Sequence, residues 1–338
     1  MVNIAIIDSG INVKDMSICK NISKGFSINY NGGYNSYQKD YNDLNGHGTY
    51  CASVIKRFCP KVKLTIIKIL DHQKMGRSEC LIEALEYLYK NPVDIISMSL
   101  STQDEQYEKK LWEICKKIKR SGMITVASLA NRANVSYPAM CEGVIGVKGA
   151  LYLAEKEYMY HPSRTIQCQG SSMPVLVDAL DGTYTFFGGN SKATANISGI
   201  IASLLEKVET IEEFEKVFKE HSCYKKKREQ RFDISSIINS SVVISETMKN
   251  EEDFRKLFDL MTNVFEISKD KSGLLLEHSL LYPELNIEKN NLGKIIREIE
   301  KEWKIHFKKE EVTLWSIRNI ATIYTLLKRT EKYENKEK

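Results

Sequence analysis

Apolar runs alternate with amphipathic stretches over the first 150 residues of the chain. A strand covered on both faces of a parallel sheet is apolar throughout, and the runs that meet this pattern are 2–7, 63–70, 93–100, 123–128 and 143–149. The stretches between them that carry apolar residues at helical spacing are 48–57, 78–90 and 107–119. Residues 24–46 are rich in Asn, Gly, Tyr and Ser, and we expect a loop there. This order predicts an α/β fold with a doubly wound, mostly parallel sheet.

The second half of the chain has a different pattern. We expect one helix that ends near residue 208 and a second helix at 209–221. A small element at 232–238 and a polar, Ser-rich linker follow them. The last ninety residues favour short helices near 251–265, 289–303 and 313–328. The expected organisation is a catalytic domain at 1–240, a linker at 241–250, a small all-α domain at 251–330 and a charged tail at 331–338.

Composition adds few constraints. The net charge is +5 with both signs abundant, so no nucleic-acid partner is expected, and Lys225–Arg228 is interpreted as a solvated loop. No apolar run reaches the ~18 residues that a membrane helix needs, so we expect no membrane association. The eight cysteines lack metal-type spacing and no signal peptide precedes the first strand, which favours reduced thiols and a cytoplasmic protein. No metal or other cofactor is expected.

Three short stretches carry candidate chemistry. An apolar strand ends in Asp8, His47 stands between two glycines, and Ser191 follows a Gly-Gly-Asn turn before a run of small residues. Each has a plain structural alternative: a helix-capping acid, a His in a turn, and a Ser at a helix N-terminus. Together, in the order Asp, His, Ser, they resemble the subtilisin family of serine proteases, whose order differs from that of chymotrypsin and of the α/β-hydrolases.

The resemblance extends over about residues 1–240. Segment 94–101 is similar to the strand that pairs with the substrate backbone in that family, and segment 126–131 is similar to the one that ends in the oxyanion-hole Asn. The resemblance therefore implies a serine endopeptidase with a protein or peptide substrate. The catalytic residues that it implies are Asp8, His47, Ser191 and Asn131, and the substrate-binding residues are Ser99, Leu100, Ser101, Leu129 and Ala130.

The chain also departs from the family pattern. Asn190 and Ala195 replace the usual Thr and Pro around the nucleophile, and Ser101 and Ala130 replace two glycines at the substrate pocket. The added atoms predict a narrow pocket that disfavours large aromatic residues. The passage from Cys59 to Lys63 lacks the insertion that forms the tight calcium site of secreted subtilisins, so calcium dependence is doubtful.

Cys51 lies one helical turn after His47, where it resembles the cysteine of the thiol-containing subtilases. A small buried packing residue is the alternative, and either case predicts inhibition by mercurials.

The C-terminal region resembles an acyl carrier protein around 280–286, 299–305 and 312–327. Lys289 stands where that family has the serine that carries phosphopantetheine, so no such group is expected. Ser279 lies in a tripeptide similar to the attachment site, but ten residues too early. A generic helical bundle is the alternative interpretation.

These features favour an intracellular endopeptidase of restricted specificity that processes a precursor peptide or protein. Without an inhibitory propeptide, a protease with a narrow substrate range is the safer one for its host. The C-terminal domain would then recruit the substrate or another protein partner. The alternatives are a catalytically inactive member of the fold that acts as a binding module or scaffold, and a general degradative protease.

Overall fold

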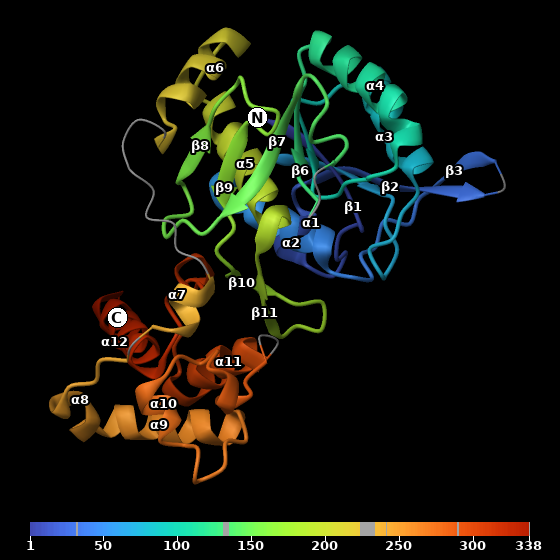
Figure 1. Ribbon diagram of the computed structural model, residues 1–338. Helices are drawn as coiled ribbons and strands as arrows, with labels where there is room; N and C mark the ends of the chain where they lie inside the picture. Colours follow the sequence, from blue (N-terminus) through green and yellow to red (C-terminus); the bar gives the residue numbers. More distant parts are fainter. Residues whose placement is uncertain (32, 131–134, 224–233, 241, 289–290, 338) are drawn as a thin grey trace. The chain divides into compact units, whose positions relative to one another are not determined.

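The computed structural model describes all residues except 32, 131–134, 224–233, 241, 289–290 and 338. The chain forms two compact units, each assembled from two separate stretches of sequence (Figure 1). The first combines Met1–Ser172 with Gly188–Gln230, and the second combines Met173–Phe187 with Arg231–Lys338. This division differs from the single boundary that we expected near residue 240, because a segment between the candidate oxyanion and nucleophile positions belongs to the second unit.

The first unit is built on a nine-stranded sheet with the order β3-β2-β4-β1-β5-β6-β7-β9-β8 (Figure 1). The strands are β1 (Asn3–Asp8), β2 (Ile22–Asn31), β3 (Tyr34–Gln38), β4 (Lys63–Lys68), β5 (Ile95–Met98), β6 (Ile124–Ser128), β7 (Val144–Ala150), β8 (Tyr158–Tyr160) and β9 (Cys168–Ser171). All neighbouring pairs from β2 to β9 are parallel, whereas β3 and β8 pair antiparallel at the two edges. The predicted α/β fold with its mostly parallel sheet is confirmed.

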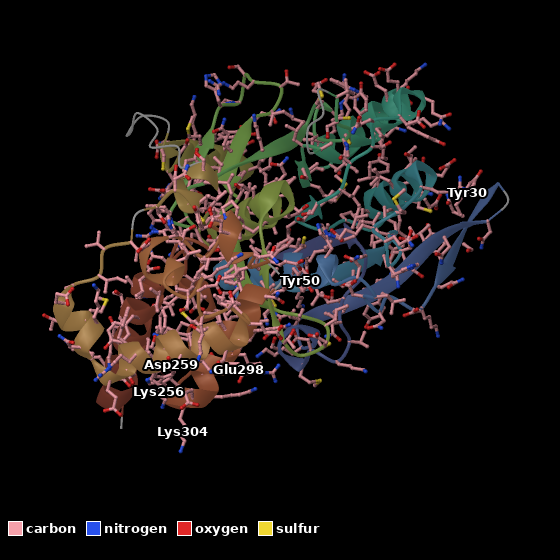
Figure 2. All side chains as sticks on the ribbon, turned by 60° about the horizontal axis from the view of Figure 1, so that its bottom comes forward. Tyr30, Tyr50, Lys256, Asp259, Glu298 and Lys304 are labelled. Atoms are coloured by element: carbon pink, nitrogen blue, oxygen red, sulfur yellow. The ribbon has the colours of Figure 1, made fainter. Side chains whose placement is uncertain are left out.

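The expected loop at 24–46 is wrong, because most of it is an antiparallel ribbon. Strand β2 pairs with β4 from Ile22 to Ser27, and its outer half pairs with β3. Tyr30, labelled in Figure 2, lies on this outer part of β2. Only Phe26, Ser27 and Ile28 of β2 are buried, so the ribbon carries a mainly polar sequence that gives little strand signal.

Helices cover both faces of the sheet. They are α1 (Met16–Cys19), α2 (His47–Phe58), α3 (Ser78–Lys90), α4 (Glu108–Arg120), α5 (Gly189–Leu205) and α6 (Ile211–Glu220), with a 3-10 turn η1 at Glu105–Tyr107. Figure 1 shows α3 and α4 together on one side of the sheet and α2 with α5 on the other. The helices expected at 48–57, 78–90 and 107–119 are confirmed as α2, α3 and α4.

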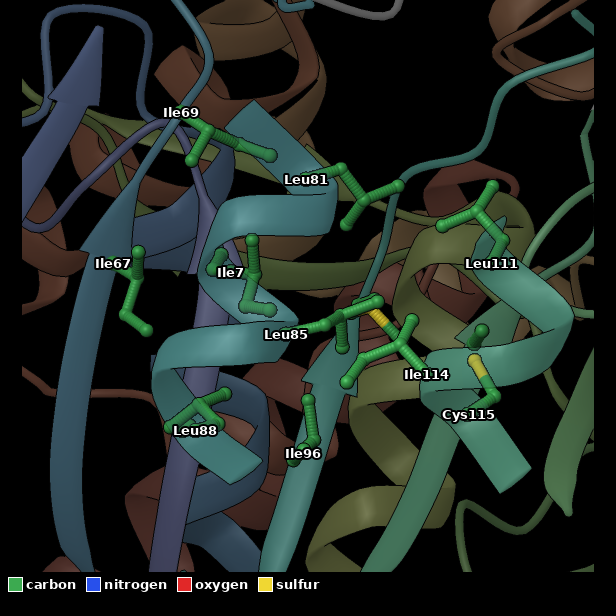
Figure 3. Close-up of a cluster of buried hydrophobic side chains, with 14 of the residues drawn as sticks. Ile7, Ile67, Ile69, Leu81, Leu85, Leu88, Ile96, Leu111, Ile114 and Cys115 are labelled. Atoms are coloured by element: carbon green, nitrogen blue, oxygen red, sulfur yellow. The ribbon is translucent and has the colours of Figure 1, made fainter. Parts of the chain in front are cut away.

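A cluster of buried aliphatic side chains joins α3 and α4 to the sheet (Figure 3). Ile7 on β1 belongs to it together with Leu85 of α3 and Ile114 of α4. Each such aliphatic side chain stabilises the fold by about 1.5–3 kcal/mol when it is fully buried. On the opposite face, the Ser198 hydroxyl of α5 donates to that of Ser97 on β5 at 2.9 Å. Helices on both faces of the sheet thus contact its central strands, β1 and β5.

The second unit contains a β-hairpin and a group of helices. The hairpin strands are β10 (Val175–Asp178) and β11 (Tyr184–Phe187). The helices are α7 (Ile234–Ile238), α8 (Glu246–Asn250), α9 (Glu252–Val264), α10 (Leu274–Glu277), α11 (Leu292–Trp303) and α12 (Ile320–Glu337), with 3-10 turns η3 (Pro283–Leu285) and η5 (Lys309–Glu311). The helical C-terminal region is confirmed, although α8 occupies part of the expected linker and α12 begins later than expected. No helix among the described residues is long and apolar enough to cross a membrane.

The hairpin is integrated into this second unit by main-chain and side-chain bonds. The Leu176 amide donates to the Val312 carbonyl at 2.9 Å, and the Lys309 ammonium donates to the Asp178 carboxylate at 2.6 Å. Gly293 of α11 approaches β11 so closely that a Cβ there would lie 2.0 Å from the Tyr184 carbonyl oxygen. Any larger residue at position 293 would therefore push α11 away from β11.

Candidate active site

Asp8 and His47 meet at the carboxyl end of β1. Asp8 Oδ1 and His47 Nδ1 are 2.8 Å apart, and both side chains are buried. The same Oδ1 accepts the Ser9 amide at 2.8 Å, and the Ser9 hydroxyl accepts the Gly48 amide at 2.9 Å. These bonds fix the carboxylate, which in turn fixes the orientation of the imidazole.

The turn before α2 places His47 as the first residue of that helix. Gly46 adopts the left-handed region, with φ of 100°. The buried Asp43 carboxylate accepts the amides of Asn45, Gly46 and Thr49 as well as the Thr49 hydroxyl. Burial works to raise the pKa of Asp43, but these hydrogen bonds outweigh it and hold the pKa below its usual value. Sequence analysis missed Asp43, because it lies three residues before the N-cap Gly46 and matches no standard capping pattern.

Close approach of α2 to β1 depends on Gly48. A Cβ at this position would lie 2.2 Å from the Gly10 carbonyl oxygen and 3.3 Å from Asp8 Cβ. Any larger residue would push the start of α2, and with it His47, away from Asp8.

Ser191 lies in the first turn of α5, after the Gly188-Gly189 pair. Its hydroxyl donates to the Ser99 carbonyl at 3.3 Å, and the Ser99 hydroxyl donates to the Ser191 carbonyl at 3.0 Å. The neighbouring Asn190 accepts the Gly149 amide and donates to the Leu129 carbonyl, both at 2.8 Å. Four bonds thus tie this turn to the segments that follow β5 and β6 and to β7.

One cavity of about 380 Å³ is lined by both His47 and Ser191. Ser99, Leu100 and Ser101 line it too, as the sequence predicts for a substrate-binding segment. Within the part of the chain that the structure describes, the backbone groups of Leu100 and Ser101 make no hydrogen bond, so this segment can pair with an extended peptide.

Leu129 and Ala130 follow β6, and the structure does not place them in this cavity. Both are half-buried, and the Ala130 amide donates to the Ser136 hydroxyl at 2.9 Å. Asn131, the predicted oxyanion residue, lies outside the described residues. Its role stays a prediction.

Cys51 is buried behind the acid and the base. Its sulfur lies 3.9 Å from Asp8 Oδ2, and burial, followed by the nearby Asp8 charge, raises the pKa of the thiol well above its usual value. The possible ligand atoms of Asp8, His47 and Cys51 lie within 4.8 Å of one another. A thiophilic ion bound there would compete with the Asp8–His47 hydrogen bond for the same atoms.

A second feature that the sequence analysis missed is a buried ion pair next to the nucleophile. Lys192, which is 0% exposed, lies 3.1 Å from a Glu155 carboxylate oxygen, and Arg57 of α2 lies 3.5 Å from the same oxygen. Burial lowers the pKa of the Lys192 ammonium, and the Glu155 charge opposes this shift. The sign of this ion pair in the sequence is the Lys that interrupts the run of small residues after Ser191.

Ser191 and the imidazole that Asp8 holds thus line the same cavity. Known proteins are similar to this chain in sequence and in fold. A family model described as the subtilase family matches residues 1–225. The chain is 27% identical over 223 residues to the minor extracellular protease Epr of Bacillus subtilis. This match covers 61% of this chain and 32% of that protein. It is 25% identical over 217 residues to an intracellular serine protease of Paenibacillus polymyxa, covering 60% and 65%. The match thus spans less than two thirds of either relative.

Solved structures are similar in fold. The crystal structure of a lanthipeptide protease superimposes with a TM-score of 0.52 at 17% identity, covering 64% of this chain and 78% of that one. An alanine mutant of an epidermin leader peptide processing serine protease from Staphylococcus aureus gives a TM-score of 0.53 at 17% identity, covering 64% and 69%. At this identity the similarity concerns the fold alone.

Proposed function

Because this chain belongs to the subtilase family, we propose that it is a serine endopeptidase in which Ser191 is the nucleophile, His47 the general base and Asp8 the orienting acid. The observation that carries the proposal is the 2.8 Å bond between Asp8 and His47 beside a cavity that His47 shares with Ser191. An aliphatic hydroxyl is a weak nucleophile at neutral pH, and a base within reach is what activates it.

The proposed reaction proceeds through an acyl-enzyme. His47, held through Nδ1 by Asp8, uses Nε2 to take the Ser191 proton as the hydroxyl oxygen attacks the scissile carbonyl. The imidazolium then gives that proton to the leaving amine as the peptide C–N bond breaks. Water then enters and gives a proton to His47 while its oxygen attacks the acyl carbonyl. The imidazolium returns that proton to the Ser191 oxygen as the ester bond breaks, which releases a carboxylic acid and restores the free serine.

The oxyanion that forms at each step needs hydrogen-bond donors. The Ser191 amide, in the first turn of α5, is one proposed donor, because the positive end of the helix dipole lies there. The side-chain amide of Asn131 is the second, by its match to the family segment. Losing one such side-chain donor costs about a hundredfold or more in turnover.

The proposed substrate is a precursor peptide or protein, bound in extended form along Ser99, Leu100 and Ser101, with one side chain in a pocket that Leu129 and Ala130 help to line. The unpaired backbone of Leu100 and Ser101 supports this binding mode. Two structural neighbours are a lanthipeptide protease and a leader peptide processing protease, which supports a processing role. The eight free thiols support an intracellular location, since thiols stay reduced there.

The second unit is proposed to recruit the substrate or a protein partner. The acyl-carrier-like fold remains a prediction, and Lys289 lies outside the described residues. Ser279 is fully buried and its hydroxyl donates to the Ile238 carbonyl at 2.9 Å, which argues against it as an attachment site for phosphopantetheine.

A fluorophosphonate probe tests the catalytic proposal, because only an activated serine is labelled. We expect labelling of the wild-type chain, and we expect Ser191→Ala and His47→Ala each to abolish it and to lower peptide hydrolysis by about 10⁴-fold or more. Ser203→Ala is the matched control, since Ser203 lies on the same helix and should leave labelling unchanged. Absence of labelling in the wild-type chain would favour the non-catalytic binding module instead.

A further inference from the structure

We infer that the cavity beside Ser191 selects a peptide with an acidic side chain, which Lys74 and Arg77 bind. The inference rests on the proposed peptide-binding function and names the substrate class of that same site. Both cations line the cavity together with His47, Ser191 and the segment from Ser99 to Ser101. Among the described residues that line it, no carboxylate is present to balance them.

The acidic residues nearest in sequence to these cations have hydrogen-bond partners of their own, and the Glu79 charge also acts on Arg77 without an ion pair. Asp71 accepts the amides of Gln73 and Met75 at 2.8 and 2.9 Å, and Glu79 accepts the Tyr107 hydroxyl at 2.6 Å. Within the described part of the chain, neither Lys74 nor Arg77 forms an ion pair with any carboxylate. A bound acidic side chain would supply the missing charge without displacing an existing partner.

The turn at 71–76 holds Lys74 in a defined position. Lys74 has φ of 64°, a left-handed conformation that is uncommon for a residue with a side chain. The Asp71 amide donates to the Met75 carbonyl at 2.9 Å, and the Lys74 amide donates to the Asp71 carbonyl at 3.1 Å. Gly76 packs tightly, since a Cβ there would lie 2.7 Å from the Ile69 carbonyl oxygen. The cation is therefore carried by an ordered turn, which lowers the entropy lost on binding.

Arg77 is positioned by an aromatic ring and by a helix. Its guanidinium lies 5.5 Å from the centroid of the Tyr30 ring, on the ribbon where Figure 2 labels Tyr30. Arg77 is also the N-cap of α3, and no side chain caps the first amides of that helix. Ser78, the first residue of α3, lines the cavity, whereas the acidic Glu79 of the same first turn does not line it.

The unpaired backbone groups of Leu100 and Ser101 indicate how such a peptide binds in the cavity. An extended chain paired with this segment runs through the same cavity as the two cations, within a few residues of the Ser191 hydroxyl. The acidic side chain is therefore expected within about four residues of the cleaved bond, on the side of the peptide that pairs with this segment.

The test uses octapeptides of otherwise neutral sequence that carry a single Asp, Asn or Lys at each position in turn. Hydrolysis by the full chain is measured as kcat/KM, and mass spectrometry of the products locates the cleaved bond. At one position near that bond we expect Asp to exceed Asn by about three- to tenfold and Lys to fall below Asn, because Lys74 and Arg77 are exposed and surface ion pairs are weak. The preference should shrink from 0.05 to 1 M NaCl, where the screening length falls to about 3 Å.

Charge reversal assigns the preference to these side chains. In Lys74→Glu/Arg77→Glu the ratio of Asp to Lys peptides should invert. Lys90→Glu/Lys117→Glu is the control for net charge, because it removes the same charge at two exposed positions outside the cavity and should leave the ratio unchanged. A wild-type profile that is flat in charge or favours Lys, or an unchanged ratio in the double variant, would overturn the inference.

Binding separates this inference from the proposed catalysis. Fluorescently labelled peptides are titrated into the Ser191→Ala chain and anisotropy is recorded, so no hydrolysis is needed. Tighter binding of Asp peptides than of Lys peptides supports the inference even if the wild-type chain proves inactive. Hydrolysis without charge preference refutes it while leaving the endopeptidase proposal intact, and the absence of binding by every peptide refutes it as well.

Discussion

At the scale of single residues, the Cys51 thiol gives a test of how tightly Asp8 and His47 are packed. Because Cys51 is buried 3.9 Å from Asp8 Oδ2, a mercury atom on its sulfur would displace the carboxylate or the imidazole. We expect a mercurial to inhibit hydrolysis by the wild-type chain and to leave Cys51→Ala active. Initial rates before and after titration with the mercurial measure this.

The other seven cysteines provide the control, since they remain in Cys51→Ala and would still react. Iodoacetamide, which needs the thiolate, should modify Cys51 slowly because the pKa of this thiol is raised. Equal inhibition of Cys51→Ala and of the wild-type chain would show that the effect comes from another cysteine.

Two small residues are predicted to set the width of the substrate pocket. Ser101 and Ala130 each place side-chain atoms where the family has glycine, and a packed space resists such atoms by about 1–3 kcal/mol. We expect Phe and Tyr just before the cleaved bond to lower kcat/KM about 10- to 100-fold relative to Ala. Ser101→Gly/Ala130→Gly should relieve this penalty without slowing the best small-residue peptide. A library that varies this one position would refute the idea if the wild-type chain prefers Phe or Tyr.

The sequence reveals the site residues that stand in short, regular motifs. Asp8, His47 and Ser191 become readable when their three motifs are taken together in that order, whereas Glu155 is not readable, because it meets Lys192 only through the fold. Its segment is a turn between β7 and β8 with no pattern of its own. Asp43 is an intermediate case. Its hydrogen-bond partners are near in sequence, but nothing in its neighbourhood distinguishes it from other Asp residues in loops.

At the scale of secondary structure elements, the Glu155 carboxylate joins α5 to α2. Replacing it by Gln leaves Lys192 buried without its partner, and removing one partner of a buried pair typically costs about 3–5 kcal/mol. We expect Glu155→Gln to lower the free energy of unfolding in urea at pH 7 by about this amount. Lys192→Met/Glu155→Gln should recover most of it, because the fully buried ammonium is then absent and the half-buried Arg57 loses only a 3.5 Å contact.

The pH dependence of this loss follows from the sign of the Lys192 shift. Burial already lowers the pKa of Lys192 from 10.5, and removing Glu155 lowers it further. The unfolded chain then binds more protons than the folded one, so the free energy of unfolding rises with pH through the window below 10.5. The gap between Glu155→Gln and the double variant should therefore narrow from pH 7 to pH 10. A constant gap would mean that Lys192 stays charged in the folded state.

The elements that the sequence predicts well are those with long apolar runs or a clear helical period. Strand β1 and helix α3 are of this kind, with most inward positions apolar. Strands β8, β9, β10 and β11 were missed because each has only three or four residues, too few for a period of two to be recognised. Tertiary pairing, rather than local preference, forms these strands.

At the scale of the whole molecule, the second unit cannot be removed by one cut. Truncation after residue 230 leaves β10 and β11 without 231–338, and exposes Val175, Leu176 and Val177, which are fully buried in the intact chain. We expect this truncated chain to aggregate, as judged by size-exclusion chromatography and light scattering.

A second deletion makes this expectation specific. The Gly189 amide donates to the Ser172 carbonyl at 3.1 Å, so the two ends of the hairpin segment lie side by side. Replacing 173–187 by a short glycine linker in the truncated chain should therefore restore a monomer with native-like circular dichroism. Aggregation of both chains alike would mean that the first unit depends on more of the second than its hairpin.

The interleaved order of the two units also bears on how the protein forms on the ribosome. The hairpin emerges before α5, yet the carbonyl and amide groups that complete it, such as those of Val312 and Leu314, are made long after both. During that interval its apolar strand has no native cover. Closure of the second unit thus waits until the segment around Val312 has been made, so a chain terminated before that segment would carry a hairpin with no partner to fold onto.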